Sequence, residues 1–69
     1  MIKVYSSEGC GNCRILKTKL DNKNIPFETS ENLDVVTALG FRRLPVMEID
    51  EEFLDYRQAV VWVNNYPTL

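Results

Sequence analysis

Two cysteines separated by two residues, Cys10-Gly11-Asn12-Cys13, stand between a strand-like and a helix-like segment. Upstream, Ile2 to Ser6 is a short alternating run with β-prone residues, which predicts a first strand. Downstream, Cys13, Leu16 and Leu20 recur at helical spacing, which predicts a helix that closes at residues 22–24. Any fold of this chain must therefore place Cys10 where a strand ends and a helix begins.

The middle of the chain repeats the alternation of strand and helix. Residues 25–29 predict a second strand and residues 31–39 a second helix, which Ser30 can cap. Leu33, Val36 and Leu39 form the expected buried stripe of that helix. Gly40 follows it, as expected where a helix ends in the left-handed conformation, so that Phe41 can pack back on the last turn.

The end of the chain predicts two strands and a helix. Residues 46–49 predict a third strand, and residues 53–54 predict a short fourth strand after an acidic turn. Residues 59–63 are β-branched enough for a strand, but Asp55 and Gln58 resemble a capping box ahead of a helical stripe. We predict a last helix over residues 55–65, with the single tryptophan, Trp62, as a packing residue.

The resulting order, β-α-β-α-β-β-α, predicts one α/β domain over residues 1–69. The first strand, helix and strand should form a right-handed parallel unit, and the last two strands a hairpin. A formal charge of -2 and a pI near 4.9 argue against a nucleic-acid partner. No apolar run approaches the roughly 18 residues of a membrane span, and no signal segment precedes the first strand. We therefore expect a cytoplasmic protein without a membrane partner, in a compartment where structural disulfides are kept reduced.

The two cysteines allow several kinds of site. A structural zinc ion takes four Cys or His ligands, and this chain has two cysteines and no histidine. A zinc or iron–sulfur site would therefore need two copies sharing Cys10 ligands, or ligands from outside. A structural staple would close too short a loop to stabilise much. An inert buried pair fits poorly with Gly9 and Gly11, which leave the backbone around Cys10 open.

A redox pair explains the arrangement best. Unpaired N–H groups and the helix dipole at the start of the helix favour a thiolate at Cys10. Cys13, one turn further in, is placed to attack a mixed disulfide on Cys10 and release the reduced substrate. We therefore predict Cys10 as catalytic nucleophile and Cys13 as resolving thiol, with no metal and no bound cofactor. A redox-idle interaction domain remains the alternative, beside the metal-binding dimer.

From Ile2 to about Asn65 the chain resembles the glutaredoxin and thioredoxin-like superfamily, on its C-x-x-C pair and on Leu44-Pro45 before the third strand. The resemblance implies a thioredoxin-like, glutaredoxin-type fold with a four-stranded mixed sheet flanked by three helices. It also implies a cis Leu44–Pro45 bond beside the cysteines, whereas Pro26 and Pro67 should be trans. The implied substrate-binding residues are Gly11, Asn12, Leu44 and Pro45.

Within that superfamily, residues 38–47 resemble the small glutaredoxin-like redoxins that reduce ribonucleotide reductase. Residues 53–58 look like a degraded form of their aromatic-Ser-Gly-Phe-Arg-Pro stretch: the aromatic and the arginine remain, and the Gly and Pro do not. The resemblance implies a dithiol–disulfide oxidoreductase of the electron-carrier type. Its expected partners are a disulfide-containing protein, with ribonucleotide reductase as one candidate, and a reductase. We expect the protein itself to be a monomer.

Glutaredoxins that use glutathione carry a Gly-Gly pair before the last helix and a basic residue shortly before the first cysteine. In this chain Asp55-Tyr56 and Ser7-Glu8 stand at those places. Asp55 would repel the carboxylate of glutathione and can itself cap the helix amides that glutathione needs. We therefore expect electrons from NADPH through a thioredoxin-reductase-type flavoprotein rather than from glutathione.

Four basic residues should lie near the cysteines: Arg14, Lys17, Arg42 and Arg43. They could favour the thiolate or attract an acidic partner segment. The simpler interpretation is a solvated charged surface, because exposed charges usually contribute little. The sequence leaves both interpretations open.

Overall fold

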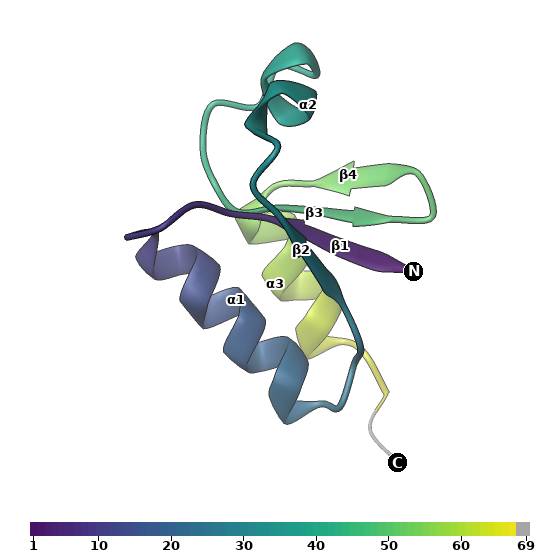
Figure 1. Ribbon diagram of the computed structural model, residues 1–69. Helices are drawn as coiled ribbons and strands as arrows, with labels where there is room; N and C mark the ends of the chain where they lie inside the picture. The colour runs from purple at the N-terminus through teal and green to yellow at the C-terminus, as the bar shows by residue number, and fades with distance from the viewer. Residues whose placement is uncertain (68–69) are drawn as a thin grey trace.

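A four-stranded sheet with helices on both faces forms the structure, a computed structural model that describes residues 1–67 (Figure 1). The elements follow the predicted order: β1 (Ile2–Tyr5), α1 (Gly11–Asn22), β2 (Glu28–Ser30), α2 (Leu33–Ala38), β3 (Val46–Ile49), β4 (Glu52–Leu54) and α3 (Tyr56–Asn64). The strand order is β2-β1-β3-β4, with β1 and β2 parallel and the other neighbours antiparallel. The predicted parallel unit and hairpin are confirmed.

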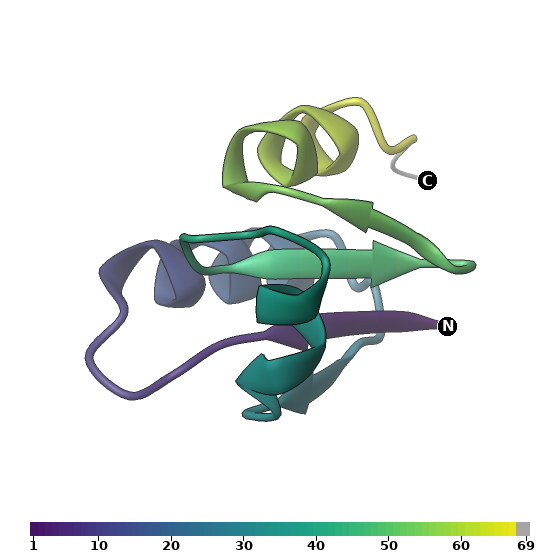
Figure 2. The same cartoon turned by 90° about the horizontal axis from the view of Figure 1, so that it is seen from above.

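The two faces of the sheet carry cores of different size. Helices α1 and α3 lie on one face and α2 on the other (Figures 1 and 2). Under α1 and α3, the buried residues are Ile2, Val4, Leu16, Leu20, Ile25, Met47, Ala59 and Val63. Under α2 they are Tyr5, Val36 and Val46. Val4 and Tyr5 belong to different clusters because successive side chains of a strand point to opposite faces.

The start of α2 differs from the prediction. Ser30 ends β2, where it pairs with Tyr5, and its hydroxyl accepts a hydrogen bond from the Asn32 amide at 3.1 Å. The helix begins two residues later than expected, at Leu33, and its N-cap Asn32 makes no side-chain cap bond. Ser30 is therefore not the helix cap, because pairing with β1 holds it in the strand.

The end of α2 confirms one expectation and corrects another. Gly40 has φ +92°, the left-handed conformation expected after the helix. The amide of Phe41 donates to the Val36 carbonyl at 3.0 Å, and the ring packs in the cluster under α2 as predicted. Leu39 is the C-cap, with 52% of its surface exposed, so its predicted place in the buried stripe is wrong. The helix ends one residue too early for Leu39 to complete the stripe.

Strand β2 begins at Glu28 rather than at residue 25. The Ile25 amide donates to the Leu20 carbonyl at 3.0 Å, so Ile25 belongs to the turn that closes α1 and is buried there. Pro26 has no N–H to contribute to a sheet ladder. The strand-like character of Ile25 therefore reflects its burial in the core, and not pairing with β1.

The last helix is confirmed. The Gln58 amide donates to Asp55 Oδ1 at 2.8 Å, and the Asp55 amide donates to Gln58 Oε1 at 3.0 Å, which completes the predicted capping box. Trp62 packs against the core as expected, and its ring centroid lies 5.1 Å from that of Tyr66. No helix within residues 1–67 is long and apolar enough to cross a membrane.

Candidate functional site

Cys10 is the N-cap of α1, in extended conformation, and a disulfide joins it to Cys13. Its Sγ accepts a hydrogen bond from the Cys13 amide at 3.1 Å. Cys10 is half-buried, whereas only 2% of the Cys13 surface is exposed. The amide donor and the start of the helix both favour negative charge on the Cys10 sulfur, which is also the sulfur that a partner can reach.

The loop that precedes Cys10 holds this residue at the N-terminal end of α1. Gly9 has φ +79°, a conformation that other residues adopt only with strain. The Cys10 amide donates to the Ser7 carbonyl at 3.4 Å, and the Cys10 carbonyl accepts from the Arg14 amide at 3.3 Å. The short connection between β1 and α1 therefore turns at Gly9 and delivers Cys10 directly to the first helical turn.

A cavity of about 480 Å³ opens beside both cysteines. Arg14 and Lys17 of α1 line it together with Glu8, and the remaining lining residues are Ser7, Gly9 and Thr18. Two of the four basic residues that were expected near the cysteines therefore lie beside them.

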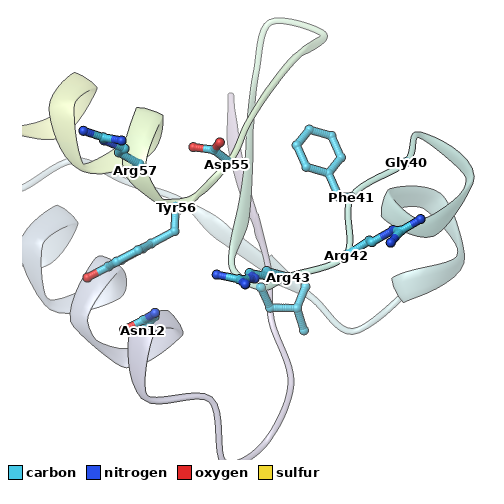
Figure 3. A pocket seen from close by; sticks show the side chains of 9 residues that line it. Asn12, Gly40, Phe41, Arg42, Arg43, Asp55, Tyr56 and Arg57 are labelled. Atoms are coloured by element: carbon cyan, nitrogen blue, oxygen red, sulfur yellow. The ribbon is translucent and has the colours of Figure 1, made fainter.

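A second cavity of about 410 Å³, which we call the arginine groove, lies between three segments that are distant in sequence (Figure 3). The α1 segment contributes Asn12, and the start of α3 contributes Asp55, Tyr56 and Arg57. The α2–β3 loop contributes the other residues, Gly40, Phe41, Arg42, Arg43 and Leu44. Asn12 stands between the two cysteines in the chain, but neither cysteine lines this groove.

The residues assigned to substrate binding do not all lie in the groove. Asn12 and Leu44 line it, and Pro45 is buried behind it, at the start of β3. Gly11 is exposed and lines neither of the two cavities. The Leu44–Pro45 bond is cis, as predicted, and within residues 1–67 no other peptide bond is cis. The role of these four residues in substrate binding stays a prediction.

Sequence reasoning did not place Phe41, Tyr56 and Arg57 in this groove. A signal for the last two was present, since the capping box at Asp55 puts both residues in the first turn of α3. Phe41 was expected only as a packing residue, and it also forms part of the groove wall. In Figure 3 the Tyr56 side chain extends toward Asn12.

Ionic contacts within residues 1–67 are few. The only ion pair there joins the Met1 ammonium to Asp50 at 3.7 Å. No group of three His, Cys, Asp or Glu side chains in these residues is placed to hold a metal ion.

Comparison with known proteins establishes the fold. No family model matches the chain, and no curated protein matches its sequence. A solved structure of NrdH-redoxin from Escherichia coli, described as a glutaredoxin-like protein with a thioredoxin-like activity profile, is similar with a TM-score of 0.80. The match covers 99% of this chain and 97% of that one, at 23% sequence identity. The chain therefore has the thioredoxin-like fold of the glutaredoxin type, and the predicted fold class is confirmed.

Proposed function

We propose that this protein is a thiol–disulfide oxidoreductase that reduces protein disulfides through Cys10 and Cys13. The observation that carries the proposal is the asymmetry of the pair. Cys10 caps α1 and is half-exposed with a backbone amide donating to its sulfur, whereas Cys13 is buried one turn further in. The thioredoxin-like fold, shared with a glutaredoxin-like redoxin, supports the same chemistry.

The reaction transfers two electrons in two exchange steps. The Cys10 thiolate attacks one sulfur of the substrate disulfide, forms a mixed disulfide and expels the other substrate sulfur as a thiolate. The Cys13 thiolate then attacks Cys10 Sγ, which forms the Cys10–Cys13 disulfide and releases the second substrate thiolate. The two released thiolates take up protons from solvent. The disulfide between Cys10 and Cys13 in this structure corresponds to the oxidised product of that cycle.

The start of α3 favours a flavoprotein reductase over glutathione as the electron source. Asp55 Oδ1 already accepts the Gln58 amide at 2.8 Å, so this helix terminus carries its own carboxylate. A glutathione carboxylate that approached the same amides would meet the charge of Asp55. We infer that NADPH supplies the electrons through a thioredoxin-reductase-type enzyme in the cytoplasm. The resemblance of residues 38–47 to the small redoxins that reduce ribonucleotide reductase makes that enzyme one candidate among protein substrates.

A coupled assay and a trapping experiment test this function. NADPH oxidation should be rapid with thioredoxin reductase and insulin as disulfide substrate, and slow with glutathione and glutathione reductase. Cys13→Ser should accumulate a mixed disulfide between Cys10 and the substrate, which mass spectrometry detects, and Cys10→Ser should accumulate none. If the wild-type protein reduces no disulfide with any reductant, including dithiothreitol, the proposed function is wrong. Efficient turnover with glutathione alone would overturn only the electron source.

A further inference from the structure

Charge is distributed unevenly between the active-site end and the rest of the protein. The chain contains eight Lys and Arg residues and ten Asp and Glu residues. Five of the basic residues line the cavity beside the cysteines or the arginine groove, which contains Asn12, with only Glu8 and Asp55 of the acidic ones. The remaining surface therefore holds three basic and eight acidic residues. An acidic protein therefore presents a basic surface at the end that carries Cys10, Asn12 and Cys13.

Among the described residues, 1–67, the arginines of this surface have no acidic partner. All four arginines of the chain line one of the two cavities: Arg14, Arg42, Arg43 and Arg57. Within residues 1–67 none of them lies in salt-bridge distance of a carboxylate, since the single ion pair there is the one at Met1. Asp55, the one carboxylate in the arginine groove, accepts the Gln58 amide. The guanidinium groups can therefore bind a carboxylate from outside, in the planar two-pronged geometry that arginine prefers.

The arginine groove combines these charges with apolar walls. Three residues with large apolar side-chain surfaces line it: Phe41, Leu44 and Tyr56. Figure 3 shows Arg43 directed toward Tyr56 and Asn12, Arg42 directed to the opposite side toward α2, and Arg57 on α3. Low-dielectric walls strengthen the attraction between a groove of one sign and a ligand of the other. A segment that lies in the groove beside Asn12 would thus meet the positive charge of Arg43, with Arg42 and Arg57 at the margins.

From this arrangement we infer that the arginine groove selects disulfide-bearing protein segments that carry Asp or Glu next to their cysteines. This inference rests on the proposed function, because it names the class of protein segment that the redox pair reduces. The acidic side chains pair with Arg42, Arg43 and Arg57, while the disulfide lies over Cys10. The acidic remainder of the surface repels the same segment elsewhere and directs it to this end.

The test compares three synthetic peptides that share one internal disulfide and differ only in flanking residues, which are Glu, Gln or Lys. At low ionic strength kcat/KM for the Glu peptide should exceed that for the Gln peptide about tenfold, with the Lys peptide slowest. In about 0.5 M NaCl the differences should shrink to about twofold, because salt screens exposed charges. Equal kcat/KM for the three peptides at low salt would overturn the inference.

Variants assign the preference to the groove. Arg42→Gln, Arg43→Gln and Arg57→Gln should each lower kcat/KM for the Glu peptide about threefold, and so reduce the ratio of kcat/KM between the Glu and the Gln peptide by about that factor. Lys19→Gln removes the same charge from α1 outside both cavities and should change neither rate. Arg43→Glu should make the Lys peptide the better substrate. If Lys19→Gln acts as strongly as the groove variants, overall charge and not the groove causes the preference, and the inference is wrong.

The two proposals fail in different ways. If the protein cannot reduce the Gln peptide at all, the proposed function is wrong. If it reduces all three peptides at one rate, the oxidoreductase stands and only the acidic specificity is lost. If oxidised glutathione is reduced as fast as the Glu peptide, the groove accepts a free tripeptide, and selection of an acidic protein segment is wrong.

Discussion

The two faces of the sheet differ in how they are built and in what they support. The face under α1 and α3 buries eight core residues beneath helices of twelve and nine residues. The face under α2 buries three, beneath a helix of six residues without a side-chain N-cap bond. The N-terminal end of α1 carries the cysteine pair and that of α3 lines the arginine groove, whereas the smaller face supplies the α2–β3 loop. The larger core and the two cysteines of α1 therefore share one face, and the other supplies one wall of the arginine groove.

The largest loss of stability is expected from a substitution in the larger core, at the residue of α1 one turn after Cys13. Leu16 is fully buried one turn beyond Cys13, so Leu16→Ala removes apolar contacts and leaves a cavity. We expect a loss of about 3 kcal/mol in the free energy of unfolding, a large part of the stability of so small a domain. Urea unfolding measures it. Ile15→Ala on the same helix is the control, with 46% of Ile15 exposed, and should cost less than about 0.5 kcal/mol.

A matched pair of helical valines tests the difference between the faces directly. Val63 of α3 is 1% exposed and Val36 of α2 is 3% exposed, so both are buried and both substitutions to alanine change helix propensity equally. We expect Val63→Ala to cost about 2 kcal/mol and Val36→Ala about 1 kcal/mol, because the short α2 can settle into the space more easily. Equal losses in thermal or urea unfolding would show that the two faces are equally rigid.

Asp55 stands where the larger face meets the arginine groove. Asp55→Ala removes the accepting half of the capping box and should lower the free energy of unfolding by about 1 kcal/mol. Asp55→Asn keeps a capping oxygen and should retain most of that stability. Both variants remove the carboxylate, so both should increase turnover with glutathione. If Asp55→Asn is destabilised as much as Asp55→Ala, the charge and not the capping hydrogen bond stabilises α3.

The smallest expected effect concerns Tyr5, the buried aromatic residue of the smaller face. Its hydroxyl donates to Glu48 Oε1 at 2.9 Å, and burial, together with this hydrogen bond and the charge of Glu48, raises the pKa of Tyr5 above its usual 10.0. The unfolded chain ionises first, so this contribution to stability is complete below pH 10 and is lost as the pH rises through the folded-state pKa. Tyr5→Phe should cost about 0.5 kcal/mol at pH 8 and weaken the alkaline loss.

Urea unfolding of both proteins between pH 8 and 11 measures this difference. The wild-type protein should lose stability more steeply than Tyr5→Phe above pH 10. Parallel curves would mean that Tyr5 does not cause the alkaline dependence.

Local signals in the sequence predicted the elements that local contacts determine. The spacing of Cys13, Leu16 and Leu20, the capping box at Asp55 and the glycine after α2 all gave elements that the structure contains. The exposure of Leu39 was not predictable from its helical spacing, because the point at which α2 ends is set by Gly40 and the packing of Phe41.

Contacts between segments that are distant in sequence explain the remaining differences between the predicted and the observed structure. Ser30 has the chemistry of a helix cap, but its pairing with Tyr5 keeps it in β2. The arginine groove joins the ends of α1, α2 and α3, and no single stretch of sequence contains it. The position of the cysteine pair at the start of α1 could be predicted because both residues and the helix start are contiguous, whereas only the fold brings Arg57 to the same groove as Asn12.

The central claim is that Cys10 attacks and Cys13 resolves, and alkylation rates test it most directly. The rate of reaction with iodoacetamide is measured against pH for Cys13→Ser, which leaves Cys10, and for Cys10→Ser, which leaves Cys13. The account predicts that Cys10 reacts at least about tenfold faster at pH 7 and loses its reactivity at lower pH than free cysteine does, because α1 and the residue 13 amide favour its thiolate. A Cys10 that titrates like free cysteine, or reacts more slowly than Cys13, would contradict it.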